Sequence, residues 1–177
     1  MFVLSELPRS LLKQKKAIIS GPDADKVYQQ GSFGELEEGK LVLSDVETLF
    51  LLEREKILLC NESQSPLTFP EVVALLSKDD PEMWVRYLLY SDLRRRGYIV
   101  KSGYGPKLEY RVYRRGAIVG KEPAKYLVYG LVEGKTISIS ELTSISNSAK
   151  LSKKDLILAV IDRQGEITYY DASEITL

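Results

Sequence analysis

Histidine is absent from this sequence of 177 residues, and cysteine occurs once, at Cys60. Proton transfer by imidazole and every histidine-containing metal site are therefore excluded within the chain. A single cysteine allows no internal disulfide and fits a reducing cytosol. Any catalysis by this polypeptide alone has to rest on tyrosine, lysine, serine or carboxylate side chains.

A short motif, Glu133-Gly134-Lys135, follows a run of residues that is typical of a strand. With Glu109 and Asp92 upstream, it is one pattern of a metal-dependent nuclease, in which carboxylates hold Mg²⁺ and a lysine stabilises the nucleophile. Three such residues occur together readily by chance, and glycine is a common turn former. A polar turn is the ordinary alternative, and we expect the turn.

The charges are unevenly distributed although 25 basic and 25 acidic residues balance overall. The segment from Arg86 to Lys125 carries eleven Lys or Arg against three acids, a net charge of +8, and the remainder of the chain is −8. A basic stretch that also bears tyrosines is typical of a polyanion-binding surface. Solvated faces of a helix and strands are the alternative interpretation.

The composition describes a globular chain with one good core or two small ones, since 44% of the residues are hydrophobic and 28% are charged. No apolar run approaches the roughly 18 to 20 residues that span a bilayer. The start, Met1 to Pro8, has no basic leader. We therefore expect no signal peptide, no membrane contact and a cytoplasmic location.

The elements that must position any site fall into two groups. In residues 1–76 we expect short strands at Ala17–Ser20 and Lys40–Leu43, with turns at Gly21-Pro22 and at 31–34. A helix follows over Asp45–Glu55, since Ser44 and Glu47 form a capping-box pattern. The turn formers between residues 61 and 81 indicate the domain boundary. The strands and the helix before this boundary predict a small α/β module as the first domain.

In residues 77–177 the signals predict a helix, three strands, a helix and two strands, with Asp80 and Pro81 starting the first helix and Gly97 ending it. This order implies a mixed sheet packed by helices, and hence an α+β fold for the whole chain. The predicted later elements are strands at 98–101, 108–113 and 126–132, a helix from Ser138 or Ser140 to Ala149, and strands at 156–162 and 166–170.

Several of these segments resemble the archaeal tRNA-intron splicing endonucleases. Residues 43–57, LSDVETLFLLEREKI, resemble the N-terminal domain of that family, and residues 87–101, YLLYSDLRRRGYIVK, resemble its helix-then-strand signature. Tyr110–Gly116, Tyr126–Val128 and Leu158–Asp162 continue the likeness in the right order, which covers nearly the whole chain. The resemblance implies an N-terminal domain and a C-terminal, restriction-endonuclease-like domain.

The family cuts precursor tRNA at bulge-helix-bulge elements and leaves a 2′,3′-cyclic phosphate and a 5′-hydroxyl, without metal or nucleotide cofactor. A base must take the 2′-hydroxyl proton, an acid must protonate the leaving oxygen, and a cation must stabilise charge on phosphorus. The family assigns these roles to Tyr, His and Lys. By resemblance, the tyrosine is Tyr113 and the lysine is Lys154, with Lys153 if the register shifts by one. The histidine position is Pro123, which has no proton to donate.

The resemblance therefore implies a structural, non-catalytic subunit, which pairs with a catalytic sister chain in a heterotetramer of two pairs and binds precursor tRNA. The family grips a bulge base between two arginines, and the corresponding positions here are Asn147 and Tyr169. A scaffold that never contacts RNA is the non-enzymatic alternative, and the metal-dependent nuclease using Glu109, Glu133 and Lys135 is the enzymatic one.

Two sets of residues are expected to serve this function. The subunit interface comprises the turn between the last two strands and the final strand, with Asp162, Glu166, Ile167, Tyr169 and Tyr170. Arg163 dilutes the negative charge of that turn. The residues expected to bind RNA are Arg94, Arg95, Arg111, Arg114, Arg115, Lys125 and Lys153.

Overall fold

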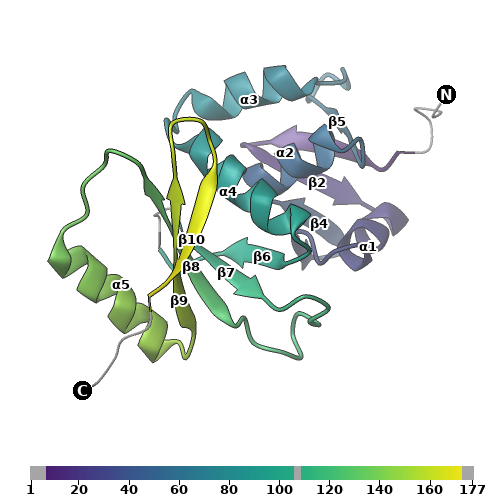
Figure 1. Ribbon diagram of the computed structural model, residues 1–177. Helices are drawn as coiled ribbons and strands as arrows, with labels where there is room; N and C mark the ends of the chain where they lie inside the picture. The colour runs from purple at the N-terminus through teal and green to yellow at the C-terminus, as the bar shows by residue number, and fades with distance from the viewer. Residues whose placement is uncertain (1–6, 106–108, 173–177) are drawn as a thin grey trace. The chain divides into compact units, whose positions relative to one another are not determined.

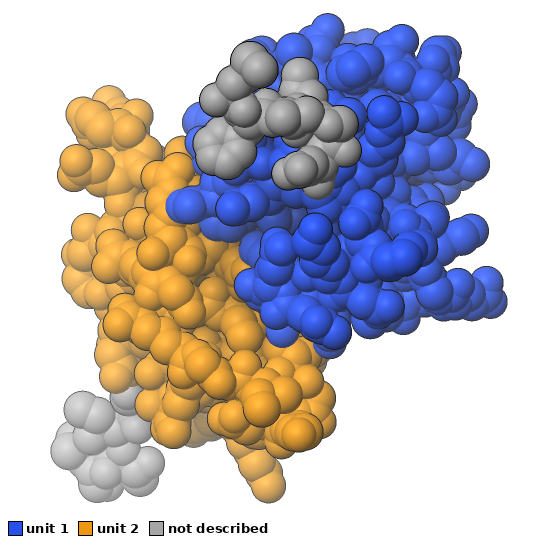
Figure 2. All heavy atoms as spheres, turned by 90° about the vertical axis from the view of Figure 1, so that its right-hand side faces the viewer, with its two compact units in different colours: residues 1–87 blue, residues 88–177 orange. Residues whose placement is uncertain are grey.

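The computed structural model describes residues 7–105 and 109–172 of the chain. The chain divides into two compact units, residues 1–87 and 88–177, which Figure 2 distinguishes by colour. In the described parts of the chain, no helix has the length and apolar character needed to cross a membrane.

The first unit is built on a five-stranded sheet in the order β3-β4-β2-β1-β5, in which only the β1–β5 pair is parallel. Its core includes the fully buried Ile19, Leu41, Leu43 and Leu59. The strands are β1 (Arg9–Lys13), β2 (Lys16–Ser20), β3 (Glu35–Glu37), β4 (Lys40–Leu43) and β5 (Leu58–Cys60), and the helices are α1 (Pro22–Gln29), α2 (Asp45–Glu53) and α3 (Phe69–Ser77).

The predicted capping box at the start of α2 is confirmed. The Ser44 side chain accepts from the Glu47 backbone N–H, and the Glu47 carboxylate accepts from the Ser44 N–H at 2.9 Å. The second carboxylate oxygen of Glu47 accepts from the Gly34 N–H at 2.9 Å. Gly34 has φ +65°, and a Cβ there would lie 2.6 Å from the Val42 carbonyl oxygen. Only glycine fits this approach of the loop to β4.

Two helices of the first unit were not predicted. Gly21-Pro22 was expected to form a turn, but Pro22 is the first residue of α1, a position where its missing N–H costs nothing. The segment 61–81 was expected to be rich in turns, but it contains α3, whose Thr68 and Glu71 form a second capping box. The strands β1, β3 and β5 were also not predicted.

The second unit carries a five-stranded mixed sheet in the order β10-β9-β8-β7-β6, in which only the β8–β9 pair is parallel. The predicted α+β fold, with a mixed sheet packed by helices, is confirmed. The elements are α4 (Met83–Arg95), which begins in the first unit, β6 (Ile99–Ser102), β7 (Glu109–Tyr113), β8 (Tyr126–Val132), α5 (Ile139–Leu151), β9 (Asp155–Ile161) and β10 (Ile167–Asp171).

Helices pack on both faces of this sheet. Ile145 and Ala149 of α5 pack against Leu127 and Leu156 on one face, and Figure 1 shows α5 lying beside β9. The C-terminal half of α4 lies against the other face, where the Tyr90 ring is 5.9 Å from the Tyr110 ring. Because successive side chains of a strand point to opposite faces, the residues of each strand divide between an α5 face and an α4 face.

Candidate functional site

The sheet register of the second unit brings Tyr113, Lys125 and Lys154 to one end of three adjacent strands. Val112 of β7 pairs with Tyr126 of β8, which pairs with Asp155 of β9. One residue further towards this end of the sheet, the corresponding row consists of Tyr113, Lys125 and Lys154. Backbone bonds from the Lys125 N–H to the Val112 carbonyl and from the Asp155 N–H to the Lys125 carbonyl hold the three strands together here. Tyr113 and Lys154 are thus two strand spacings, about 10 Å, apart in backbone position.

Tyr113 is 8% exposed and packs among Ala117, Ala124 and Ile99. Its position in β7 directs it to the α5 face, together with Arg111. A buried phenol beside an apolar cluster is held in a fixed rotamer, which suits a positioned acid or base.

Lys154 follows the end of α5. The C-terminus of this helix is closed by bonds from the Lys153 N–H to the Lys150 carbonyl and from the Lys154 N–H to the Ala149 carbonyl. Lys153 occupies the left-handed position of this motif, with φ +54°. The Lys154 ammonium donates to the Ser152 carbonyl at 2.9 Å and lies 5.5 Å from the centroid of the Tyr104 ring. The helix end thereby holds Lys154 on the α5 face, whereas Lys153 is exposed.

Pro123 lies in the loop between β7 and β8, two residues before Lys125. It is exposed, and it has neither a backbone N–H nor a polar side-chain atom. Because the whole sequence contains no histidine, no other position of this chain supplies an imidazole.

A cationic rim surrounds this end of the sheet. We use the term for the residues at the end of β7 and the starts of β8 and β9, which are Arg114, Arg115, Lys125, Lys153 and Lys154. Lys125 is partly neutralised by Asp155 at 3.4 Å, and its pKa is raised chiefly by its interaction with Tyr126. The Arg115 guanidinium lies over the Tyr98 ring, 5.0 Å from its centroid. Four of the predicted RNA-binding cations thus lie on this rim, and a fifth, Arg111, lies two residues inward along β7.

Arg94 and Arg95 lie in the last turn of α4, where positive charge complements the helix dipole. The helix ends as predicted at Gly97, which has φ +87° and donates to the Arg94 carbonyl, while the Tyr98 N–H donates to the Leu93 carbonyl. β6 begins two residues later, and its Ile99 pairs with Tyr113. The turn after α4 therefore leads into the same end of the sheet as the cationic rim.

The opposite end of the sheet is acidic. One oxygen of the Asp162 carboxylate accepts from the N–H groups of Gln164 and Glu166, and Glu133 accepts from the Arg163 N–H at 3.3 Å. These bonds shape the turn between β9 and β10. The turn contains two acidic residues, Asp162 and Glu166, and one basic residue, Arg163. Since β8 has seven residues, this turn and the cationic rim lie about 20 Å apart.

β10 is an edge strand of this sheet. Asp162 donates to the Glu166 carbonyl and Ala172 donates to the Leu156 carbonyl, so the even-numbered residues between them bond to β9. The N–H and C=O groups of Ile167, Tyr169 and Asp171 therefore point away from β9. Within residues 7–105 and 109–172 no further strand pairs with this edge. Tyr170 is 54% exposed on the α5 face.

The side chain of Tyr169 points to the α4 face and is engaged within the chain. Its hydroxyl donates to Asp92 at 2.6 Å, Arg96 donates to the same carboxylate oxygen at 2.7 Å, and the Arg96 guanidinium lies 5.3 Å from the Tyr169 ring. Burial and, next, the hydrogen bond to Asp92 raise the pKa of Tyr169 well above its usual range. Tyr169 thus ties β10 to α4 with its side chain while its backbone faces the open edge.

Replacing Tyr169 by phenylalanine should destabilise the chain by about 1 to 2 kcal/mol at pH 7, because a hydrogen bond to a charged group is lost. This cost should shrink as the pH rises above about 10, the usual pKa of tyrosine. Above that pH, Tyr169 of the wild type releases its proton in the unfolded state but keeps it in the folded state, which lowers the free energy of unfolding. The phenylalanine variant has no such proton, so its free energy of unfolding does not fall for this reason. Urea unfolding at pH 7 and pH 10.5 measures the difference. Tyr170→Phe is the control, and an equal cost at both pH values would contradict the assignment.

The carboxylates of the metal-dependent alternative do not come together. Glu109 pairs in register with Tyr129, and Glu133 lies four residues beyond Tyr129, just past the end of β8 and about 13 Å away. Glu109 accepts from the Tyr104 N–H, and Asp92 is bound by Tyr169 and Arg96. In the part of the chain that the structure describes, no three Cys, Asp or Glu side chains are grouped as metal ligands would be. Residues 133 and 134 form the polar turn that was expected.

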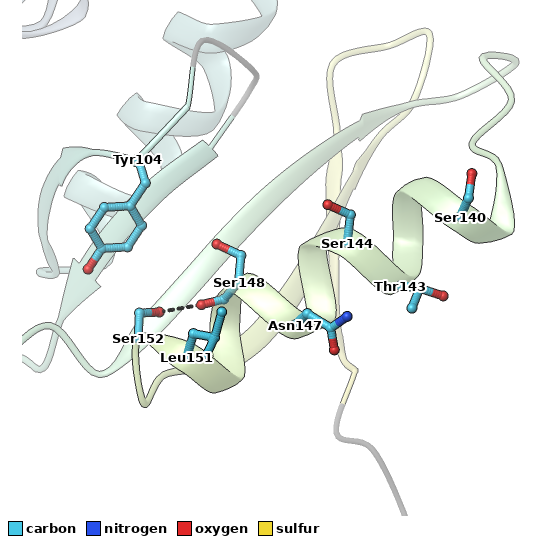
Figure 3. Close-up of a pocket in the computed structure, with 8 residues that line it drawn as sticks. All are labelled: Tyr104, Ser140, Thr143, Ser144, Asn147, Ser148, Leu151 and Ser152. Carbon is cyan, nitrogen blue, oxygen red and sulfur yellow. Dashed lines mark hydrogen bonds between the residues drawn. The ribbon is translucent and has the colours of Figure 1, made fainter.

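A groove between α5 and the connection of β6 to β7 was not predicted (Figure 3). Its volume is about 720 Å³. One wall is Tyr104, which lies across from Ser148 and Ser152 in Figure 3, and the other is a polar face of α5. Tyr104 lies between the strands that were predicted at 98–101 and 108–113, and no role was predicted for it. The groove is lined by the C-cap residue Ser152 and by six residues of α5, which are Ser140, Thr143, Ser144, Asn147, Ser148 and Leu151.

Comparison with known proteins identifies two family domains in the chain. Residues 9–73 match the tRNA intron endonuclease, N-terminal domain, and residues 83–169 match the tRNA intron endonuclease, catalytic C-terminal domain. The chain is 35% identical over 162 residues to the tRNA-splicing endonuclease of Thermococcus onnurineus, over 92% of this chain and 89% of that protein. It is 32% identical over 166 residues to that of Methanococcus vannielii, over 94% and 93% of the two chains. It is 39% identical over 146 residues to the tRNA-splicing endonuclease of Pyrococcus furiosus, over 82% of this chain and 83% of that protein.

Proposed function

The chain belongs to the tRNA intron endonuclease family, and on that premise we propose that it acts as a structural subunit of a tRNA-splicing endonuclease. In this role it positions precursor tRNA and catalytic sister chains for intron removal at bulge-helix-bulge sites. Catalysis is supplied by the sister chains, and no metal or nucleotide cofactor takes part.

The observation that carries this proposal is the missing proton donor. Tyr113 and Lys154 lie at the same end of β7 and β9, on either side of β8, as a base and a phosphate-stabilising cation require. The residue that corresponds to the family's histidine is Pro123, and the sequence contains no histidine at all. A positioned general acid contributes about 10²- to 10⁴-fold to the rate. Without it, this chain retains a partial site with little activity of its own.

The distribution of charge supports a role in holding RNA. The cationic rim, Arg111 and the end of α4 form a basic region around one end of the sheet. Contacts of this kind bind phosphates without regard to sequence and fix the position of an RNA duplex. A scaffold that never contacts RNA would have no use for this concentration of positive charge.

The other end and the open edge of the sheet support a role in assembly. The backbone N–H and C=O groups of Ile167 and Tyr169 point to the open edge of β10, where an edge strand of the sister chain pairs with them. The acidic turn around Asp162 and Glu166 suits a basic pocket on a second pair of chains. Two such pairs form a heterotetramer in which symmetry sets the separation of two active sites, one for each cleavage point.

Reconstitution with the catalytic relative from the same organism tests the proposal. A bulge-helix-bulge RNA should be cut by the mixture and not by either chain alone, with 2′,3′-cyclic phosphate and 5′-hydroxyl ends and with no effect of EDTA. Denaturing gel electrophoresis of end-labelled RNA measures the cleavage. Efficient cleavage by this chain alone would refute the structural role, and inhibition by EDTA would favour a metal-dependent enzyme.

A further inference from the structure

We propose that one face of the sheet in the first unit is a second phosphate-binding surface, which holds the backbone of the precursor tRNA. We call this surface the basic hairpin and define it by Arg9 and Lys13 of β1 and Lys16 of β2. The inference rests on the proposed function, because it names a further part of this chain that holds the RNA. The basic hairpin belongs to the first unit, whereas the cationic rim, the groove beside α5 and the family's catalytic positions all belong to the second.

The three side chains of the basic hairpin point to the same face of the sheet. Alternate residues of a strand share a face, so Arg9 and Lys13 lie on one face of β1, and Lys13 pairs in register with Lys16 of β2. All three side chains are exposed. The opposite face carries Ala17 and Ile19 of β2, which are fully buried, and β2 contacts both α1 and α2. The basic hairpin thus faces away from these two helices.

The basic hairpin lies on interior strands, where lysine has no protective role. On edge strands, lysine prevents pairing with other chains. The order β3-β4-β2-β1-β5 places β1 and β2 between other strands, so this reason does not apply. Lys13 and Lys16 also lie directly opposite each other, and like charges in that arrangement weaken the pairing of strands. A phosphate bound between the two ammonium groups would replace this repulsion by attraction.

The turn between β1 and β2 fixes the two lysines in place. It consists of Gln14 and Lys15, with φ +46° and +64°, a conformation in which asparagine and glycine are the usual residues. The Lys15 ammonium donates to the Asp79 carboxylate, and this ion pair ties the turn to the segment after α3. Among the described residues, no carboxylate forms an ion pair with Lys13 or Lys16. Their two charges are therefore available to a ligand.

The first unit is acidic as a whole, so the place of these cations within it is informative. Residues 1–87 contain ten Lys or Arg and fifteen Asp or Glu, but β1 and β2 contain no acidic residue. The carboxylates on the same face belong to Glu35 and Glu37 of β3, and Glu37 pairs in register with Lys40. Because β4 separates β3 from β2, these carboxylates lie about 10 Å from β2 in backbone position. Positive charge is thus concentrated on β1 and β2.

The arrangement of the cations favours a phosphate backbone over a protein partner. Arg9 and Lys13 are four residues apart along β1, about 13 Å, and Lys16 lies about 5 Å across from Lys13. Cations spread in this way can contact successive phosphates of an RNA strand without reading its sequence. A protein partner would need apolar contact area as well. Leu11 and Ile18, which lie between the cations, are only partly exposed and offer little of it.

The salt dependence of RNA binding tests the inference. The full-length chain is titrated with a precursor tRNA at several salt concentrations, and filter binding measures the dissociation constant. The double variant Lys13→Gln, Lys16→Gln should bind about tenfold more weakly at about 0.1 M salt, because two phosphate contacts are lost. The slope of log Kd against log salt should fall by about 1 to 2. The double variant Lys13→Arg, Lys16→Arg keeps both charges and should bind as the wild type does.

The matched control is Lys26→Gln combined with Arg54→Gln. It removes the same charge from exposed positions of α1 and of the C-cap of α2, and it should leave the slope unchanged. A wild-type slope for the glutamine variant of Lys13 and Lys16 would show that the inference is wrong while the proposed function stands. Weaker assembly with the sister chain at an unchanged RNA affinity would also overturn it, in favour of a protein contact. If the wild type does not bind precursor tRNA, both proposals fail.

Discussion

Replacing Pro123 by histidine should raise the cleavage activity of this chain by about 10²- to 10⁴-fold over that of the wild type. The substitution returns an imidazole to the loop before β8, two residues from the row that joins Tyr113, Lys125 and Lys154. Because Pro123 is exposed and donates no backbone hydrogen bond, the change disturbs no core contact. Single-turnover cleavage of a bulge-helix-bulge RNA, with the chain at equal concentration in each assay, measures the gain.

The pH profile and two controls make this experiment specific. An imidazole acts as an acid only when it is protonated, so the gain over the wild type, compared at the same pH, should shrink as the pH rises above about 6.5. Pro123→Ala should show no gain, and adding Tyr113→Phe to Pro123→His should remove it. A gain that is equal for alanine and histidine, or one that survives the loss of the Tyr113 hydroxyl, would contradict the assignment of this position to the missing acid.

Replacing Ile167 by proline should weaken assembly with the sister chain while the chain itself stays folded. The Ile167 N–H points to the open edge of β10, so proline removes no bond of the β9–β10 ladder. In the assembly, the partner carbonyl that this N–H binds would be left unsatisfied. This corresponds to an increase of about 10- to 100-fold in the dissociation constant.

Ile167→Ala is the matched control for this substitution, since it removes the side chain but keeps the N–H. It should assemble nearly as the wild type does, as measured by sedimentation of the mixed chains. Thr168→Pro should behave differently from both, because the Thr168 N–H faces β9 and its loss should lower the stability of the chain. Normal assembly of Ile167→Pro would show that this edge is not the pairing surface.

Local signals in the sequence were sufficient for most of the second unit. Gly97 after the helix, Ser138 before α5 and the run Tyr126–Val132 each specify an element by short-range chemistry, and each lies where it was predicted. The first unit was harder to predict. Proline is a common turn former, but Pro22 starts α1. The strands β1, β3 and β5 are short, so pairing with neighbouring strands determines them more than the β propensity of their own residues does.

The composition alone determined which chemistry this chain lacks. Without histidine, no imidazole acid exists in this chain, whatever fold it adopts. The tertiary structure decided which residues lie together on one surface. Residues 104, 111 and 154 are distant in sequence, and only the strand register and the end of α5 bring the ring of Tyr104 within 5.5 Å of both cations. The separation of Glu109 from Glu133 likewise follows from sheet pairing, which no local pattern encodes.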